Sequence, residues 1–198
     1  TEDAERFRLT LLKLLAMAEQ RQGDAGHPGV DIVIIGGGAT GVELAAELRE
    51  ASGVYAAYGF QNLNAIKDVR ITLLEGASRI LAPLPERVSI AASKLLHQHG
   101  ISVVTDTRVT TIEADKVTVA SGTSYAADIC VWAAGIRAPE FLATLGLPTN
   151  RAGQLEVTGM LNVQGHANIF ALGDCAACTG PDGKLLPPRA QAAHQHAD

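Results

Sequence analysis

The chain has 198 residues, 47% of them hydrophobic and 4% aromatic, and a formal net charge of −5. This length fits one large domain, or one domain with part of a second. Abundant alanine and glycine with few aromatic residues favour helices packed on a sheet over an all-β sandwich. The acidic balance, without a long basic run, argues against nucleic acid as a partner.

Cysteine usage and hydropathy limit the class of protein further. Cys130, Cys175 and Cys178 are too few and too clustered for a disulfide framework, which favours an intracellular, reducing compartment. The apolar stretches are too short to span a bilayer, and the N-terminal residues show no signal pattern. We therefore expect the chain itself to be soluble.

The first predicted elements in chain order are a helix, a linker, a strand and a second helix. Residues 3–22 are predicted to be helical from apolar residues at helical spacing: Leu9, Leu12, Leu15 and Ala16. Residues 23–29 have the composition of a linker. Residues 31–35 (DIVII) predict a fully buried strand, and an amphipathic helix that continues to about Tyr58 follows it.

The pattern then alternates between strands and helices. Residues 69–75 predict a second strand, Pro85 and Glu86 begin a helix that ends at Gly100, and residues 101–104 predict a third strand. Three β-favouring runs separated by turn residues predict a β-meander: 107–113, 116–120 and 123–126. The last predicted elements are a buried strand, a short apolar run and a helix that begins at Arg189: 129–133, 169–172 and 189 onward.

Strands and helices in this order require right-handed crossovers and a parallel sheet. We therefore predict an α/β fold with a Rossmann-like parallel sheet, helices on one face and the three-stranded meander on the other. Residues 1–29 would form a connecting helix and linker, and residues 30–147 the Rossmann-like domain. Residues 148–198 would form a separate segment.

A glycine-rich loop joins the first predicted strand to the second helix. Gly36-x-Gly38-x-x-Gly41 is weak evidence by spacing alone, but this position is where the dinucleotide fold needs it. Gly36 permits the tight turn, Gly38 lets the backbone approach a pyrophosphate, and Gly41 lets helix and strand pack closely. The helix N-terminus then faces the anion, so the whole loop is a candidate site: Gly36, Gly37, Gly38, Ala39, Thr40 and Gly41. A plain tight turn between strand and helix is the alternative.

Glu75 ends the second predicted strand, where an acid accepts hydrogen bonds from the ribose hydroxyls of the nucleotide. It lies 34 residues after Gly41, which requires a long first helix or an added loop. The neighbouring Gly76 is included in the candidate site. The first cation after this acid is Arg79, so the sequence predicts a preference for NADH over NADPH. A solvated strand-end glutamate is the alternative.

Five segments occur in an order that resembles the type II (alternative) NADH:quinone oxidoreductases, which are FAD-containing flavoproteins of the two-dinucleotide-binding-domain fold: GGGATGVELAAEL, LLEG, VWAAGI, IFALGDCA and PPRAQAAHQ. The resemblance covers nearly all of this chain but only the middle of such a protein. The family's N-terminal FAD-binding glycine loop and C-terminal membrane-associating segment have no counterpart in the printed sequence. The resemblance therefore implies an internal part of such a flavoprotein, with residues 30–147 as its NAD(H)-binding domain and residues 148–198 as a partial segment of its FAD-binding domain.

The resemblance implies roles for residues outside the glycine loop. Ala134 and Gly135 would lie under the nucleotide, and Glu43 near its nicotinamide side; a glutamate favoured by the helix dipole is the alternative for Glu43. Gly173 and Asp174 would bind the flavin ribityl hydroxyls, and an N-cap is the alternative for Asp174. The helix that begins at Arg189 would direct its N-terminus at the flavin ring, which adds three residues to the candidate flavin site: Arg189, Ala190 and Gln191.

Gln191 and Gln195 match the family's Ala-Gln-x-Ala-x-Gln motif, which implies a quinone site; two exposed helix residues at i and i+4 are the alternative. The Cys175/Cys178 pair follows the flavin-binding acid directly, so we interpret it as two small, partly buried residues. A redox or soft-metal role is its alternative. The histidine pairs are spaced i, i+2, which does not predict a metal site.

The resemblance implies a flavoprotein that passes a hydride from NADH to FAD and two electrons to a membrane quinone of a respiratory chain. The cofactors would be NAD(H) and FAD, with no catalytic side chain in this segment and the chain inactive on its own. The whole protein would lie peripherally on the cytoplasmic side of a membrane, with a homodimer left open. Another FAD/NAD(P)-linked reductase, of the ferredoxin or disulfide type, and a non-catalytic NADH-sensing module are the alternatives.

Overall fold

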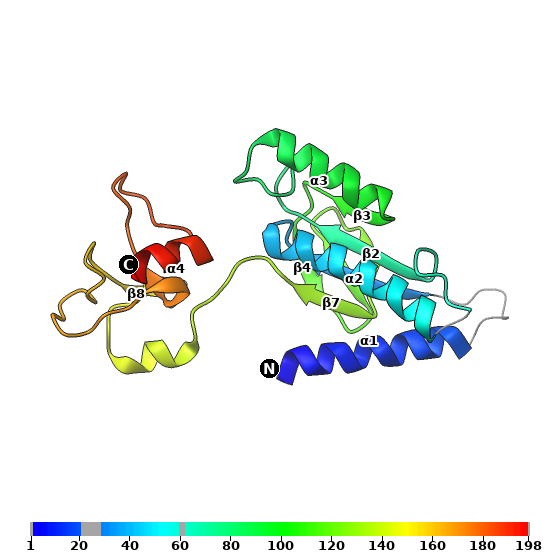
Figure 1. Cartoon of the computed structure of the whole chain (residues 1–198), viewed down its shortest axis with the longest axis horizontal. Helices are drawn as coiled ribbons and strands as arrows, with labels where there is room; N and C mark the ends of the chain where they lie inside the picture. Colours follow the sequence, from blue (N-terminus) through cyan, green and yellow to red (C-terminus); the bar gives the residue numbers. More distant parts are fainter. Residues whose placement is uncertain (1, 21–28, 60–61, 198) are drawn as a thin grey trace. The chain divides into compact units, whose positions relative to one another are not determined.

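Figure 1 shows a computed structural model of the chain, which describes residues 2–20, 29–59 and 62–197. The chain forms two compact units, Thr1–Gly135 and Ile136–Asp198. The first unit contains the predicted nucleotide-binding elements, and the second contains the predicted flavin-binding segment. The finer domain limits at residues 29 and 147 stay a prediction, and most of the predicted linker 23–29 lies outside the described residues.

The first unit is built on a four-stranded parallel sheet with the strand order β3-β2-β1-β7. The strands are β1 (Val30–Ile35), β2 (Val69–Leu74), β3 (Ile101–Val104) and β7 (Ile129–Trp132). Helix α2 (Ala39–Tyr58) connects β1 to β2, and helix α3 (Glu86–Gln98) connects β2 to β3. The length of α2 and the loop after it account for the long separation between Gly41 and Glu75. The predicted strand–helix alternation is confirmed.

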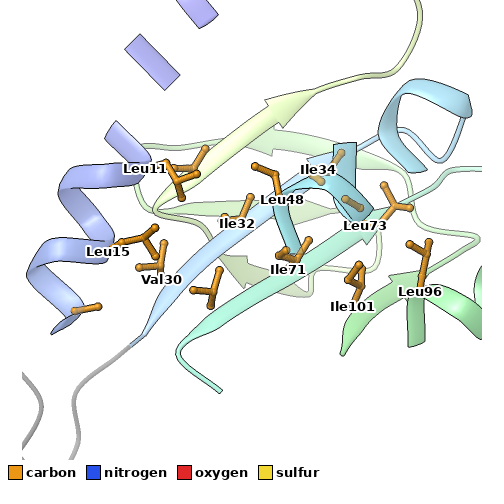
Figure 2. Close-up of a cluster of buried hydrophobic side chains, with 14 of the residues drawn as sticks. Leu11, Leu15, Val30, Ile32, Ile34, Leu48, Ile71, Leu73, Leu96 and Ile101 are labelled. Carbon is orange, nitrogen blue, oxygen red and sulfur yellow. The ribbon is translucent and has the colours of Figure 1, made fainter. Parts of the chain in front are cut away.

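One face of this sheet packs against helices. Figure 2 shows Ile32 and Ile34 of β1 and Ile71 and Leu73 of β2 beside Leu48 of α2. Helix α1 (Glu2–Gln20) and α3 add to the same cluster, with residues that are at most 4% exposed: Leu11, Leu15, Ala18 and Leu96. Each fully buried aliphatic side chain stabilises the fold by about 1.5–3 kcal/mol.

The other face of the sheet packs against an antiparallel meander of β4 (Val109–Ile112), β5 (Lys116–Val119) and β6 (Ser124–Ala126). The alternate residues of β1 and β2 lie in this second cluster together with buried residues of β5: Val33, Ile35, Leu74, Val117 and Val119. The period of two along each strand therefore divides the side chains between helices and meander. The predicted architecture, with helices on one face and a meander on the other, is confirmed.

The buried stripe of α1 contains Leu11, Leu15 and Ala18, whereas Leu9 is 52% exposed. Leu11 lies four residues before Leu15 and shares its face, and Leu9 does not. One sequence expectation about burial is wrong. Trp132, predicted within a fully buried strand, is 61% exposed because β7 is an edge strand and ends at this residue.

The second unit has little regular structure. Its elements are η1 (Glu140–Leu145), β8 (Leu155–Glu156), η2 (Gly173–Cys175), β9 (Ala176–Ala177) and α4 (Ala190–Ala197). Helix α4 begins one residue after the predicted start. In the apolar run 169–172, Phe170 makes an isolated antiparallel bridge with Asn162 and no strand forms. The core of this unit is a cluster that includes Leu142, Leu155, Val157 and Val163.

The order of the parallel strands places a topological switch point between β1 and β7. From β1 the chain proceeds outward to β2 and β3, and it then returns to β7 on the other side of β1. The connections that leave the carboxyl ends of β1 and β7 therefore diverge. In open α/β sheets, ligands bind at such a topological switch point.

Candidate functional site

The glycine loop closes tightly between β1 and the start of α2. Gly36 has a φ of +112°, and a Cβ at this position would lie 2.7 Å from the backbone nitrogen of Ala134. A Cβ at Gly41 would collide with the carbonyl oxygen of Gly36. Only glycine fits either position, so the loop brings the end of β1 against the end of β7.

Gly38 has free space on the side where a side chain would project, whereas Gly36, Gly37 and Gly41 have close neighbours there. Among the described residues, no heavy atom lies within 4 Å of a Cβ built at Gly38, and residues 38–40 are exposed. Gly38 is the N-cap of the 20-residue helix α2, with no side-chain cap and no acidic residue in the first turn. The first N–H groups of a helix have no partner within it, and the dipole there favours an anion. This surface is therefore suited to a pyrophosphate.

The Glu75 carboxylate lies directly beside the loop. Its Oε2 accepts a hydrogen bond from the Gly37 N–H at 2.5 Å, and its Oε1 accepts one from the Ala77 N–H at 2.7 Å. Each carboxylate oxygen has two lone pairs, so each keeps acceptor capacity for a hydroxyl. The structure thus places this predicted site residue at the glycine loop, with its orientation fixed by two backbone donors.

The remaining candidate residues of the first unit border the same carboxyl edge of the sheet. Ala134 and Gly135 follow β7 directly, and Gly135 has a φ of +87°. The indole N–H of Trp132 donates to the Ala134 oxygen at 3.1 Å. Glu43, in the second turn of α2, is exposed, as is Gly76. The structure therefore gathers the nucleotide-site candidates on one side of the first unit.

In the second unit, Asp174 lies in η2 with an exposed side chain. Its backbone oxygen accepts a hydrogen bond from Gln154 Nε2 at 3.0 Å. The preceding Gly173 has a φ of +72°, and a Cβ there would lie 3.6 Å from the Cβ of Ala193. Helix α4 therefore packs on the turn that presents the Asp174 carboxylate. This acid precedes no α-helix, so the N-cap alternative has no support here.

Helix α4 carries the predicted flavin and quinone residues. Arg189 precedes its first residue, Ala190, and both are exposed. Gln191 and Gln195 are exposed and one helical turn apart, so they share a face. Gln195 also lines a hollow of about 430 Å³ within the second unit, together with His196, Cys178 and Leu186; Gln191 does not line it.

The cysteines are all free thiols. Cys175 Sγ lies 3.2 Å from the Leu172 oxygen, and Cys178 is buried at 6% exposure in the apolar cluster of the second unit. Burial raises the pKa of the Cys130 thiol in the first unit. Cys175 and Cys178 therefore have the environments of small packed residues.

The sequence analysis missed the loop that follows Glu75 as part of the site. The Leu81 N–H donates to the Gly37 oxygen at 2.7 Å, and Leu81 has a φ of +51°. The side chain of Ile80 is fully buried against Gly37. A non-glycine residue with positive φ leaves no signal in the sequence, so only the structure reveals this contact.

A family model for the pyridine nucleotide-disulphide oxidoreductases matches residues 1–197. The chain belongs to this family. It is 43% identical over 169 residues to a type II NADH:quinone oxidoreductase of Haemophilus influenzae. The matched region covers 85% of this chain and 38% of that protein. It is 36% identical over 200 residues to the demethylphylloquinone reductase NdbB of Synechocystis, covering 100% and 44%.

Among solved structures, this oxidoreductase chain resembles NDH2 from Plasmodium falciparum, in complex with NADH, with a TM-score of 0.74 at 22% identity, covering 90% of this chain and 38% of that one. It also resembles the ferredoxin reductase for the CYP199A2 system from Rhodopseudomonas palustris, with a TM-score of 0.66 at 26% identity, covering 85% and 39%. The chain spans less than half the length of these relatives.

Family membership implies binding of NAD(P) and FAD. The residues of the first unit fit a dinucleotide. Gly38 lies at the N-terminus of α2, and the space where a side chain would project from it is free. The residues of the second unit fit part of a flavin site, because an exposed carboxylate at Asp174 suits a polyol. Among the described residues, no group of three or more His, Cys, Asp or Glu is placed to hold a metal ion. No described helix has the length and apolar character needed to cross a membrane.

Proposed function

We propose that this chain is the NADH-binding part of a flavoprotein NADH:quinone oxidoreductase, with a segment of its flavin site attached. The observation that carries the proposal is the open side of Gly38 at the N-terminus of α2, directly beside the fixed carboxylate of Glu75. The similarity to a relative named as a type II NADH:quinone oxidoreductase supports quinone as the final acceptor.

On the nucleotide side, the backbone of the glycine loop binds the pyrophosphate, and the N–H groups of Ala39 and Thr40 supply donors in the first turn of α2. Glu75 accepts hydrogen bonds from the ribose hydroxyls, since its carboxylate is already oriented by Gly37 and Ala77. The other candidates complete the surface around the nucleotide: Gly36, Gly41, Glu43, Gly76, Ala134 and Gly135.

On the flavin side, the turn at Gly173 presents the Asp174 carboxylate to the ribityl hydroxyls. The N-terminus of α4, from Arg189 and Ala190, directs a positive dipole at the flavin ring, which stabilises negative charge there. Gln191 and Gln195 contact the quinone from one face of α4. When bound, the cofactors supply hydride transfer from NADH to flavin and the two electrons for the quinone.

This function places the whole protein peripherally on the cytoplasmic side of a respiratory membrane. Its two substrates would be a quinone dissolved in the membrane and NADH in solution. The chain's own residues bind, orient and shield the reactants, because the cofactors carry the chemistry. We propose no general acid, base or nucleophile among its side chains.

The test is a steady-state assay of the purified flavoprotein that carries this chain. We expect NADH oxidation with a short-chain soluble quinone, and far slower oxidation with a ferredoxin or a disulfide substrate. The similarity to a ferredoxin reductase makes the ferredoxin arm necessary. Preferred reduction of ferredoxin or disulfide would contradict the quinone assignment, and NADH binding without turnover of any acceptor would favour a sensing module.

A further inference from the structure

Arg79 is half-buried and donates hydrogen bonds to the segment that follows it and to α3. Its Nη1 donates to the Leu84 oxygen at 2.9 Å and to Ser89 Oγ at 2.6 Å, and its Nη2 donates to the Ala82 oxygen at 2.5 Å. These acceptors belong to the loop before α3 and to the first turns of α3 itself. The guanidinium therefore fixes the segment that follows Glu75 onto this helix.

Ser89 extends the same network inward. It is 3% exposed, and its hydroxyl donates to the Ile80 oxygen at 2.7 Å while accepting from Arg79. A hydroxyl can donate and accept at once, so Ser89 connects the guanidinium to the backbone of residue 80. The backbone of residues 80–84 is thereby held at several successive carbonyl groups.

Gly37 of the glycine loop is held on one side by this fixed segment and on the other by Glu75. The Gly37 oxygen accepts from the Leu81 N–H at 2.7 Å, and the Gly37 N–H donates to the Glu75 carboxylate at 2.5 Å. A Cβ at Gly37 would lie 2.7 Å from Ile80 Cγ2, so the backbone rests directly on this buried side chain. The position of Gly37 therefore depends on the same segment that Arg79 and Ser89 hold.

We propose that Arg79, acting through Ser89, Ile80 and Leu81, is a positioning residue for the dinucleotide-binding loop. This role is exerted through the protein backbone, by the hydrogen bonds of Arg79 and Ser89. Its guanidinium orders the backbone of Leu81, whose positive φ of +51° is unfavourable for a leucine and needs such support. The ordered Leu81 N–H then fixes Gly37, next to Gly38 where the pyrophosphate binds. This inference rests on the proposed NADH site.

The chain offers a matched control in Arg49. This buried arginine also donates to backbone oxygens, those of Ala65, Val69 and Gly100, but at the opposite, amino end of the parallel strands. Arg79→Met and Arg49→Met each remove a guanidinium that binds carbonyls. Only the first variant is expected to alter the glycine loop, so general loss of stability and loss of loop order can be separated.

The experiment titrates the 198-residue chain with NADH by energy transfer from Trp132, which is its single tryptophan, at a temperature well below the melting transition. We expect Arg79→Met to raise the Kd by about tenfold and Ser89→Ala to raise it by a smaller factor. Arg49→Met should lower the melting temperature and leave the Kd within twofold. If Arg79→Met fails to fold, Ser89→Ala and Arg79→Lys provide the same comparison.

Amide hydrogen exchange without nucleotide gives a second readout. Residues 36–38 should exchange faster in Arg79→Met than in Arg49→Met, since only the former releases Leu81. An unchanged Kd in Arg79→Met, or equal loss of affinity in both variants, would overturn the inference. If the unmodified chain binds no NADH, the proposed function fails, and the exchange difference alone then decides whether Arg79 orders the loop.

Discussion

Glu75 would meet two kinds of donor in the proposed complex, namely loop N–H groups and ribose hydroxyls. NADPH carries a phosphate in place of one hydroxyl, and this phosphate repels the carboxylate. The Coulomb repulsion is about 4 kcal/mol per charge pair at roughly 4 Å and an effective dielectric constant of about 20. Solvent and salt reduce this to about 1–3 kcal/mol, or roughly 5- to 150-fold in affinity. The first cation after Glu75 is Arg79, whose guanidinium donates to Leu84 and Ser89.

We therefore predict that the chain binds NADH more tightly than NADPH, and that Glu75→Gln narrows the difference by removing the charge. Parallel titrations at moderate salt measure both constants. Glu113→Gln, an exposed substitution in the meander, should leave the ratio unchanged. Equal constants for the two nucleotides in the unmodified chain would show that Glu75 does not face the ribose.

Two of the motif glycines, Gly41 and Gly38, should respond differently to alanine. Gly41→Ala introduces a collision with the Gly36 oxygen and should prevent stable folding. Gly38→Ala has open space and a φ of −72°, so its melting temperature should change little. The added methyl group would occupy the pyrophosphate surface and weaken NADH binding by about tenfold or more. Thermal melts and titrations check both, and normal NADH binding by Gly38→Ala would contradict the proposed role of the loop.

At the scale of elements, the sequence predicted the parts whose signals are local. The DIVII run, the glycine loop and the helix that follows it each carry their own pattern, and all three form as expected. Long-range packing left no such signal. The exposure of Trp132, for example, depends on β7 being an edge strand.

The same division holds for the candidate site. The motif glycines and the strand-end acid can be predicted because the strand–turn–helix geometry of the dinucleotide fold places these residue types at defined positions in the sequence. The Arg79–Ser89 network could not, since these residues are ten positions apart and act through a loop of irregular conformation. The second unit was predicted mainly by resemblance, because its short strands and turns carry little periodicity.

Helix α4 is the element on which the quinone assignment depends. Gln191 and Gln195 lie one turn apart on it, so both amides can contact one ligand. In the complete flavoprotein, replacing both with alanine should raise the quinone KM or lower quinone-dependent kcat by about tenfold, while stopped-flow reduction of the flavin by NADH changes little. Gln164→Ala, an exposed substitution elsewhere in the second unit, is the control. Equal damage to both half-reactions would refute the assignment.

At the scale of the whole molecule, the two units carry complementary parts of the proposed chemistry. The first unit has the glycine loop and Glu75, which in the proposed function bind NADH. The second unit has the Asp174 carboxylate and the N-terminus of α4, which would bind only the ribityl chain and the ring of a flavin. The printed sequence contains one G-x-G-x-x-G motif, and α2 uses it.

The 198-residue chain should therefore bind NADH but not retain FAD. Hydrogen bonds to one charged group contribute about 1.5–3 kcal/mol each, whereas nanomolar retention requires about 12 kcal/mol. Without a second loop for the flavin's pyrophosphate, the Asp174 segment supplies only a fraction of that free energy. We expect a colourless protein after gel filtration with added FAD, while the same preparation binds NADH. A yellow product with one tightly bound FAD per chain would show that the described flavin residues suffice.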